Sequence, residues 1–332
     1  MTALPSVRKI SSDKFYSEFH GHLVEHLQVV LACLRSSDFD KDRSGLIFLA
    51  GDSSLDNKYW FNDSAPPPRN GYHDAIRGNC IKDVCFHLNN ELTADKELQE
   101  RIAVKGCINT SIEATTLSQR GKSFCCSTLF PQDEFIRDNI TSNDVLVVSV
   151  GGNDIALAPS LGTIFNLVLL VFLAPTCFLR CATGVVLPLG SIGSFFLGFP
   201  IGFGYFVRKF RTEMARYISS LCSNTKPRLV CVCAIYFLDV KGRGSWADRM
   251  LSLMGYNRNP ERLQILIRRI FVTAISKINI PGVKILPLPL YEALDGSDSK
   301  DYVARVEPSD RGGRKLAEFI LNSIDKKIAK TP

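Results

Sequence analysis

The chain has 332 residues, of which 45% are hydrophobic and 22% are charged, and its formal net charge is +7. This length and apolar content exclude a disordered chain and allow one large domain or two small ones. The 40 Lys and Arg residues are spread along the sequence and form no basic stripe with interleaved aromatic residues, so we expect no nucleic-acid partner.

The first expected element is an amphipathic helix over residues 11–34, inside an N-terminal segment of residues 1–40. Apolar residues recur there at helical spacing; they are Phe15, Phe19, Leu23, Leu27, Val30, Leu31 and Leu34. His22 and His26 fit the pattern His-x-x-Glu-His, and two histidines four apart on a helix can bind zinc. Both border the apolar stripe and no further ligand is identifiable, so a structural role is favoured.

Residues 45–50 are a short apolar run that predicts a buried strand, and Gly51-Asp52-Ser53 follows it directly. A proline-rich loop over residues 64–71 and a helix over residues 74–88 are expected next. Further strands are predicted at residues 102–108, 144–150, 228–237 and 283–288, and helices at residues 208–221, 259–278 and 313–328. This alternation predicts an α/β protein with three layers, α/β/α, around a sheet of about five parallel strands.

The segment of residues 161–207 interrupts this alternation. Between Ile155 and Val207 the only charged residue is Arg180. Residues 161–179 would span about 28 Å as one helix, close to the thickness of a bilayer core. We expect a membrane hairpin or a re-entrant segment; a hydrophobic lid over a substrate site and ordinary buried core helices are the alternatives. The basic residues Arg208, Lys209 and Arg211 that follow would place the flanking domain on the cytoplasmic side.

The pattern of the eleven cysteines does not predict disulfides. No CxxC pair occurs, Cys231 and Cys233 alternate within an apolar run, and Cys125 adjoins Cys126. The N-terminus has no apolar signal core. A reducing compartment with cysteines as core residues is therefore favoured. We expect the protein at the cytoplasmic face of a membrane, or in the cytoplasm if residues 161–207 do not insert.

Two short motifs follow predicted strands and are the main candidates for chemistry. Ser53 ends a tight Gly-Asp-Ser turn just past a buried strand, where its hydroxyl can be exposed at the edge of the sheet. Gly151-Gly152-Asn153-Asp154 follows another strand. Ligands of such sheets bind at the carboxyl ends of the strands, so the two loops should meet. A glycine N–H and an asparagine amide are suitable donors for an oxyanion hole.

These motifs, in this order, resemble those of the SGNH (GDSL-type) hydrolases. Gly51-Asp52-Ser53 matches the first block of that family, and Asp56-Asn57 extends the match. Gly151, Asn153 and Asp154 match the third block, Gly-x-Asn-Asp. The resemblance implies the SGNH, flavodoxin-like fold over residues 41–160 and 208–332. It also implies Ser53 as nucleophile, with its own N–H and the Asn153 amide as oxyanion donors.

The other two blocks depart from the family pattern. Glu113 stands where the second block has its oxyanion glycine. Glu307 replaces the histidine of the last block, Asp-x-x-His, and Ala304 replaces the aspartate. No histidine occurs after His87, so a Ser-His-Asp triad cannot form from its usual positions. We expect Glu113 and Glu307 to face Ser53 as a coupled pair of carboxyls, one with a raised pKa that acts as general base.

The expected activity is hydrolysis of an acyl or acetyl ester on a lipid or a glycan, without an organic cofactor. The first alternative is a catalytically inactive SGNH-like fold that binds a ligand or a partner protein. The second is a metal-assisted esterase or phosphoesterase that holds Mg²⁺ or Ca²⁺ through an acidic cluster; its candidate ligands are Asp52, Glu113, Asp154 and Glu307.

Other residues are secondary candidates. His73, next to Asp74 after the proline-rich loop, is a replacement base, although an exposed or capping histidine is the simpler interpretation. Arg305 is expected to pair with one of the acids or to bind an anionic substrate. Trp246, Tyr256 and residues 257–260 lie in a long connection of the kind that often walls a cleft.

Overall fold

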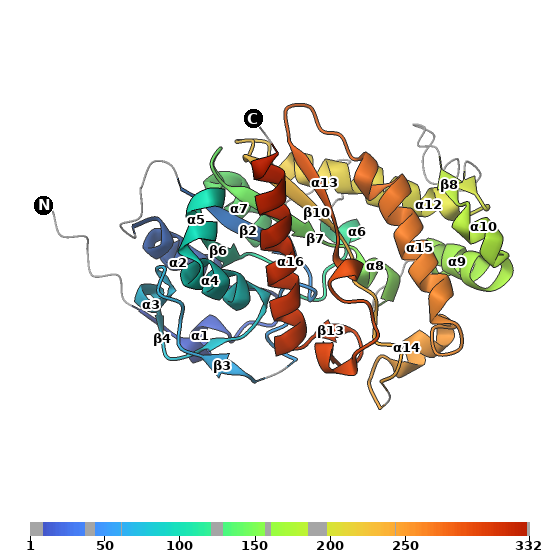
Figure 1. The fold of residues 1–332 in the computed structure, drawn as a ribbon, viewed down its shortest axis with the longest axis horizontal. Helices are drawn as coiled ribbons and strands as arrows, with labels where there is room; N and C mark the ends of the chain where they lie inside the picture. The colour runs from blue at the N-terminus through green and yellow to red at the C-terminus, as the bar shows by residue number, and fades with distance from the viewer. Residues whose placement is uncertain are drawn as a thin grey trace, which may run out of the picture.

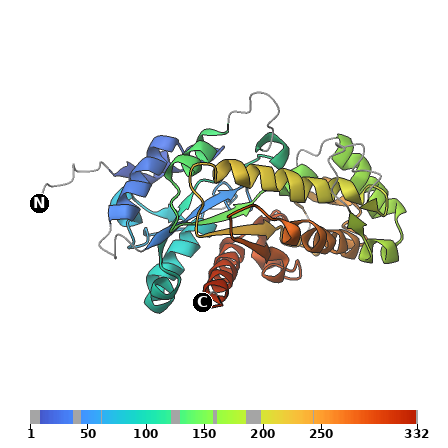
Figure 2. The same cartoon turned by 90° about the horizontal axis from the view of Figure 1, so that it is seen from above.

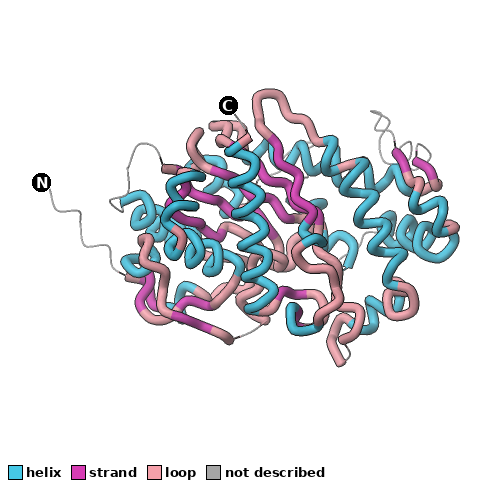
Figure 3. Tube along the Cα trace, viewed as in Figure 1, coloured by secondary structure: helices cyan, strands magenta, loops and turns pink. Residues whose placement is uncertain are grey.

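The computed structural model describes residues 9–36, 44–60, 62–120, 129–156, 161–184, 198–242 and 244–330. Its centre is a sheet of five parallel strands in the order β11-β10-β7-β2-β6, drawn in magenta in Figure 3. Their bounds are β2 (Gly45–Gly51), β6 (Val104–Asn109), β7 (Val145–Ser149), β10 (Leu229–Ala234) and β11 (Ile285–Pro289). All residues of β2, β6, β7 and β10 are buried. The predicted α/β fold with five parallel strands is confirmed.

Helices cover both faces of this sheet (Figures 1 and 2). On one face lie α2 (Val24–Ser36), α7 (Pro131–Asn139) and α13 (Met214–Leu221). On the other lie α4 (Val84–Ala94), α15 (Pro260–Thr273) and α16 (Asp310–Ala329). Strands buried on both faces are mostly apolar, which is why β2, β7 and β10 are continuous hydrophobic runs in the sequence.

Shorter elements lie in the connections and at the carboxyl edge of the sheet. Their bounds are β1 (Ile10–Ser11), α5 (Lys96–Ile102), α6 (Leu117–Arg120), α8 (Gly152–Ala156), π-helix η2 (Arg208–Glu213), α14 (Asp248–Leu253), the 3-10 turns η3 (Ile275–Lys277), η4 (Leu290–Glu292) and η5 (Ser299–Asp301), β12 (Tyr302–Val303) and β13 (Glu307–Pro308). Of these, α8 and β13 carry residues of the candidate site.

The predicted single helix over residues 11–34 is wrong. A short helix α1 (Ser12–Phe15) ends in a turn that includes Gly21 at φ 88°, and α2 begins only at Val24. The turn brings the His22 ring onto Phe15, with centroids 4.0 Å apart, and burial lowers the pKa of His22 to about 4. His22 and His26 therefore do not share a helix, and no group of three or more metal-ligating side chains occurs among the described residues.

The helix predicted over residues 74–88 is also wrong at its start. The chain forms α3 (Tyr72–Ala75), β4 (Ile76–Arg77) and β5 (Cys80–Ile81), with β5 paired to β3 (Ser64–Ala65) inside the predicted proline-rich loop. The α4 helix then begins after Asp83, whose carboxylate accepts a hydrogen bond from the Phe86 N–H at 2.7 Å. This N-cap satisfies a backbone donor that the helix leaves unpaired.

The apolar segment is not one long helix. It forms α9 (Leu161–Val168), π-helix η1 (Leu169–Leu173), α10 (Thr176–Arg180), the paired strands β8 (Thr183–Gly184) and β9 (Gly198–Phe199), and α12 (Phe203–Val207). The break comes at Pro175, which lacks the N–H that a continuing helix needs. No helix in the described ranges is long and apolar enough to cross a membrane.

The described part of this segment packs on the start of α15. The Arg262 guanidinium donates to the carbonyls of Val171 and Ala174, and Arg269 donates to the Ala182 carbonyl at 2.5 Å. These bonds satisfy backbone acceptors that π-helix η1 and the following turn leave open. Residues 185–197 of the apolar segment lie outside the described residues.

The described cysteines are all free. Seven of these nine are buried, while Cys177 and Cys181 are exposed. Cys125 and Cys126 lie outside the described residues.

Candidate active site

The two motif loops meet at the carboxyl ends of β2 and β7. The Asp52 N–H donates to the Ser149 carbonyl of β7 at 3.1 Å. The Asp52 carboxylate accepts from the N–H groups of Ser54 at 3.1 Å and Gly151 at 3.3 Å. Burial is the main reason that the pKa of Asp52 is raised. Asp52 therefore ties the loop that carries Ser53 to the loop that carries Asn153.

Ser53 and Glu307 are both buried and line the same pocket, and the Ser53 hydroxyl lowers the pKa of the Glu307 carboxyl. Glu307 lies in β13, just before Ser309 caps α16. The Asn57 amide donates to the Pro308 carbonyl at 2.7 Å. That bond joins chain segments 251 residues apart, so it holds Glu307 beside the Ser53 turn.

The electrostatics of Glu307 differ from those of an exposed carboxyl. Burial raises its pKa to about 8; the neighbouring Ser53 hydroxyl opposes the rise, and the negative charges of Asp52 and Glu113 add to it. Its Oε2 atom has no hydrogen-bond partner among the described residues. A carboxyl with a pKa this close to neutral can accept a proton from a serine hydroxyl far better than an ordinary glutamate.

Asn153 and Gly152 begin α8, and both line the pocket that contains Ser53. One N–H of the Asn153 amide donates to the Thr115 carbonyl at 2.9 Å, which orients the side chain and leaves its second N–H for another acceptor. The Gly152 N–H is the first of a helix and has no intrahelical acceptor. With the Ser53 N–H, these groups form a candidate oxyanion hole.

A pocket opens at these polar groups. Ser53, Gly152, Asn153 and Glu307 form one side of it. The remaining wall comes mainly from the connection after β10, from α14 and its C-terminal end, and from Val306; it includes Leu238, Trp246, Met250, Leu251 and Met254. An apolar wall that faces a few converging polar groups is the usual construction of a small-molecule site.

Glu113 lies close to this site but is held by a different partner. Its carboxylate accepts from the Trp60 indole N–H at 2.8 Å, and Trp60 stacks on Trp246 with ring centroids 5.5 Å apart. Burial and the charge of Asp56 raise the pKa of Glu113 to about 7, while Lys58 and the Trp60 bond lower it. The structure therefore brings Glu307 to Ser53 and places Glu113 behind the tryptophan pair, where its charge still acts on Glu307.

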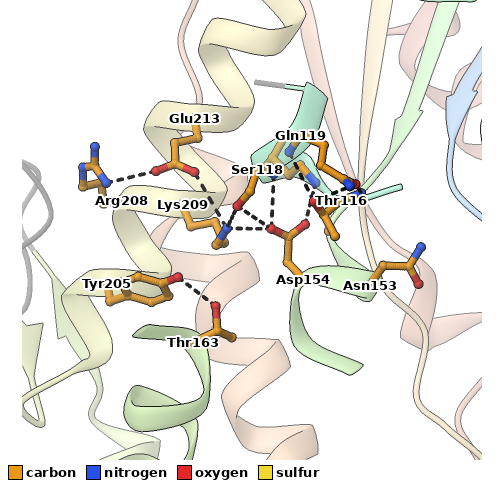
Figure 4. A network of polar contacts seen from close by, with 12 residues as sticks. Thr116, Ser118, Gln119, Asn153, Asp154, Thr163, Tyr205, Arg208, Lys209 and Glu213 are labelled. Atoms are coloured by element: carbon orange, nitrogen blue, oxygen red, sulfur yellow. Dashed lines mark hydrogen bonds and ion pairs between the residues drawn. The ribbon is translucent and has the colours of Figure 1, made fainter. Parts of the chain in front are cut away.

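Asp154 does not line the pocket, and Figure 4 shows its carboxylate directed at Ser118 and Lys209. Its carboxylate accepts from the Leu117 and Ser118 N–H groups at 2.5 and 3.2 Å, and from the Lys209 ammonium at 2.6 Å. Lys209 lies in η2, and its side chain is buried together with that of Asp154. Their ion pair therefore joins α8 to η2, the helix that follows the apolar segment. In the alternative with a metal ion, Asp154 would join Asp52, Glu113 and Glu307, but it pairs with Lys209, and the described residues contain no group of three or more metal-ligating side chains.

Asp56 is also committed to a structural contact. It pairs with the Lys58 ammonium at 2.5 Å and accepts from the Asn109 amide at 3.2 Å, all fully or almost fully buried. The Asn109 amide donates in addition to Asp83 at 3.1 Å. These contacts stabilise the loop that follows Ser53, and none of these side chains lines the pocket.

The remaining candidates have other contacts. The His73 ring is 44% exposed and pairs with Asp74 at 3.3 Å, in α3 and not beside Ser53. Arg305 is buried, donates to Asp248 and Asn257 at 2.8 Å each, and pairs with neither Glu113 nor Glu307. Ala304 and Arg305 have φ of 49° and 72°, a strained turn that these bonds hold just before Glu307.

Sequence reasoning missed Trp60, Met250 and the role of Lys209. Trp60 and Trp246 are the only tryptophans of the chain, which was the one available signal that they could act together. Lys209 was interpreted as part of a basic cluster that marks membrane topology. Its burial beside Asp154 depends on a contact 55 residues away, which no local pattern reveals.

No protein-family model matches the sequence, and no curated protein matches it. The structure is similar to a family 3 carbohydrate esterase from Clostridium thermocellum, with 12% identity and a TM-score of 0.41 over 86% of this chain and 98% of that chain. It is similar to an acetyl xylan esterase from Geobacillus stearothermophilus, with 13% identity and a TM-score of 0.40 over 85% of this chain and 96% of that chain. It is also similar to a lipase/acylhydrolase from Enterococcus faecalis, with 12% identity and a TM-score of 0.37 over 85% of this chain and 96% of that chain. Similarity at this level does not assign an activity.

The raised pKa of Glu307 predicts how stability changes with pH. Between its ordinary value of 4.5 and about 8, the folded state binds a proton that the unfolded state has released, so stability falls as pH rises. The Glu307→Gln variant should lose this contribution, which is at most about 1.4 kcal/mol per pH unit. Urea unfolding at pH 5, 6, 7 and 8 measures how the free energy of unfolding changes with pH. Glu100→Gln, at an exposed position, is the control. The same change with pH in the wild type, Glu307→Gln and Glu100→Gln would contradict the prediction.

The buried ion pair between Lys209 and Asp154 predicts a large loss of stability on truncation. Lys209→Met keeps the length of the side chain but leaves a buried carboxylate without its cation, which should cost about 3–5 kcal/mol in the free energy of unfolding. Arg101→Met removes a cation from an exposed pair with Asp325 and should cost much less. A Lys209→Met protein as stable as Arg101→Met would show that the pair contributes little.

Proposed function

We propose that the chain is an ester hydrolase in which Ser53 is the nucleophile and Glu307 the general base. The observation that carries the proposal is that Ser53 and the buried Glu307 carboxyl, whose pKa is raised, line the same pocket. A nucleophile in contact with its base is the arrangement that covalent catalysis needs. The similarity of the motifs to those of SGNH hydrolases is consistent with this assignment.

The reaction would proceed in two steps. Ser53 Oγ attacks the ester carbonyl while its proton passes to the Glu307 carboxylate. The oxyanion binds to the N–H groups of Ser53, Gly152 and Asn153, and the alcohol leaves with the proton from Glu307. Water then attacks the acyl-serine, gives its proton to Glu307, and releases the acid as Ser53 Oγ takes that proton back.

The pocket favours an ester whose acid part is apolar. Met250, Leu251 and Met254 would contact an acyl chain bound with its carbonyl at Ser53. Methionine side chains adapt to chains of different length because they are unbranched and flexible. A glycan acetyl ester fits the polar end of the pocket but leaves this wall without a ligand, so an acyl ester is the preferred substrate.

A ligand-binding protein without turnover is the second candidate. It is favoured by the same raised pKa, because a Glu307 carboxyl with a pKa of about 8 is mostly protonated at pH 7. A protonated carboxyl can donate a hydrogen bond to a bound ester but cannot accept the Ser53 proton. Ester hydrolysis above pH 8, where Glu307 is ionised, would favour the hydrolase, and its absence there would favour the binding protein.

Two substitutions test the proposal directly. Ser53→Ala should abolish labelling by a fluorophosphonate probe and lower the kcat/KM for p-nitrophenyl butyrate by about a thousandfold or more. Glu307→Gln, which keeps size and hydrogen bonding, should lower kcat/KM by about a hundredfold or more. Glu100→Gln should be fully active. If the wild-type protein at pH 8.5 neither reacts with the probe nor hydrolyses the ester, the hydrolase is refuted and the binding function remains.

The pH dependence tests the role of Glu307 separately. The free enzyme needs Glu307 deprotonated, so kcat/KM should rise about tenfold per pH unit below the pKa of about 8 and then level off. Glu113→Gln removes a negative charge that raises this pKa, so the profile should move to lower pH. A profile that stays in place, or moves to higher pH, in this variant would contradict the coupling of the two carboxyls.

A further inference from the structure

The apolar segment exposes large hydrophobic side chains at one end of the molecule, the right-hand end of Figure 1. Of the twelve such side chains exposed in the described chain, seven lie between residues 165 and 201. Leu173 is 70% exposed and Phe172 is 52% exposed. Single exposed hydrophobic residues are normal on soluble proteins, but a concentration of them marks an interaction site.

Several of these residues come from segments that lie together at this end of the molecule (Figure 1). A Cβ atom on Gly255 would lie 3.2 Å from the Phe172 ring, which places the end of η1 beside the turn after α14. Leu253, the last residue of α14, is 64% exposed. The rings of Phe178 and Phe199 have centroids 5.0 Å apart. We call this surface the apolar end face and define it by Phe172, Leu173, Phe178, Phe199 and Leu253.

The charge around the apolar end face is positive. No Asp or Glu occurs between Ile155 and Thr212. Arg249 and Arg258, on α14 and just after it, are exposed. Arg180 is also exposed and pairs with Glu261 at 2.8 Å. Exposed aromatic and aliphatic side chains flanked by arginines suit an interface of acyl chains and anionic headgroups.

The apolar end face is continuous with the candidate active site through α14. Met250 and Leu251 of this helix line the pocket that contains Ser53. Arg249 and Leu253 are four residues apart on the same helix and are both exposed. One helix therefore presents one side to the surface and the other side to the pocket.

We propose that the apolar end face docks the protein on an anionic lipid surface, lying in the interface without crossing it. A lipid ester would then reach Ser53 along α14, a step that rests on the proposed hydrolase function. A second copy of the chain fits the face less well, because a two-fold contact through α14 would bring its arginines against their own counterparts.

Flotation of the full-length protein with vesicles tests the docking. We expect binding to vesicles of phosphatidylcholine with phosphatidylglycerol, and weaker binding to phosphatidylcholine alone or in high salt. Leu173→Ser with Leu253→Ser should weaken binding about tenfold or more, since both side chains are largely exposed in the free protein and would be buried in lipid. The matched control is Phe19→Ser with Val272→Ser, two exposed apolar residues elsewhere, which should bind like the wild type.

The outcomes separate docking from catalysis. Ser53→Ala should float with the vesicles as the wild type does, because docking needs no chemistry. Absence of flotation with anionic vesicles would overturn the proposal, as would equal binding by both double variants. A concentration-dependent dimer in analytical ultracentrifugation that Leu173→Ser with Leu253→Ser disrupts, without vesicle binding, would overturn it in favour of a second copy. Flotation by a protein that hydrolyses no ester would support docking and refute only the hydrolase.

Discussion

The site depends on a carboxyl that is buried without a cation. Glu307 makes no ion pair within the described chain, and Asp52 and Glu113 add negative charge near it. Water would stabilise the ionised form, but Glu307 is buried, so the proton is retained to higher pH. Burial thus moves a glutamate towards the proton affinity that histidine has when exposed. The same burial costs stability above neutral pH, which the rest of the fold must offset.

The fold offsets this cost by fixing the three segments that meet at Ser53. Asp52 bridges the first two loops through backbone N–H groups, and Asn57 holds the strand of Glu307 through the Pro308 carbonyl. Both contacts use side chains from one short loop after β2. The strained turn at residues 304 and 305 is held by the buried Arg305, which donates to Asp248 and to the Asp239 carbonyl. Each segment is therefore positioned before any substrate binds, as a preorganised site requires.

The sheet and the positions of Ser53 and Asn153 were predictable because both rest on local patterns. A run of residues buried on both faces identifies a parallel strand, and its end identifies the ligand-binding edge. The N-terminal helix was not predictable, because Gly21 and the packing of Phe15 on His22 override an unbroken helical pattern. The partners of Glu113, Asp154 and Arg305 were not predictable either. Each is bound to a residue at least 36 positions away, and hydrophobic periodicity carries no information about such pairs.

The apolar segment is linked to the loop that carries Asn153. Its first helix, α9, is joined to α12 by the bond between Thr163 Oγ1 and the Tyr205 hydroxyl at 2.7 Å (Figure 4). The same helical run continues into η2, where Lys209 pairs with Asp154. Because Asp154 directly follows Asn153, sliding η2 past α8 would have to break a buried ion pair before it could move the Asn153 amide. The substrate proposed to bind along α14 and the lipid surface proposed to contact η1 would therefore meet an arrangement in which these contacts already hold the loop that carries Asn153.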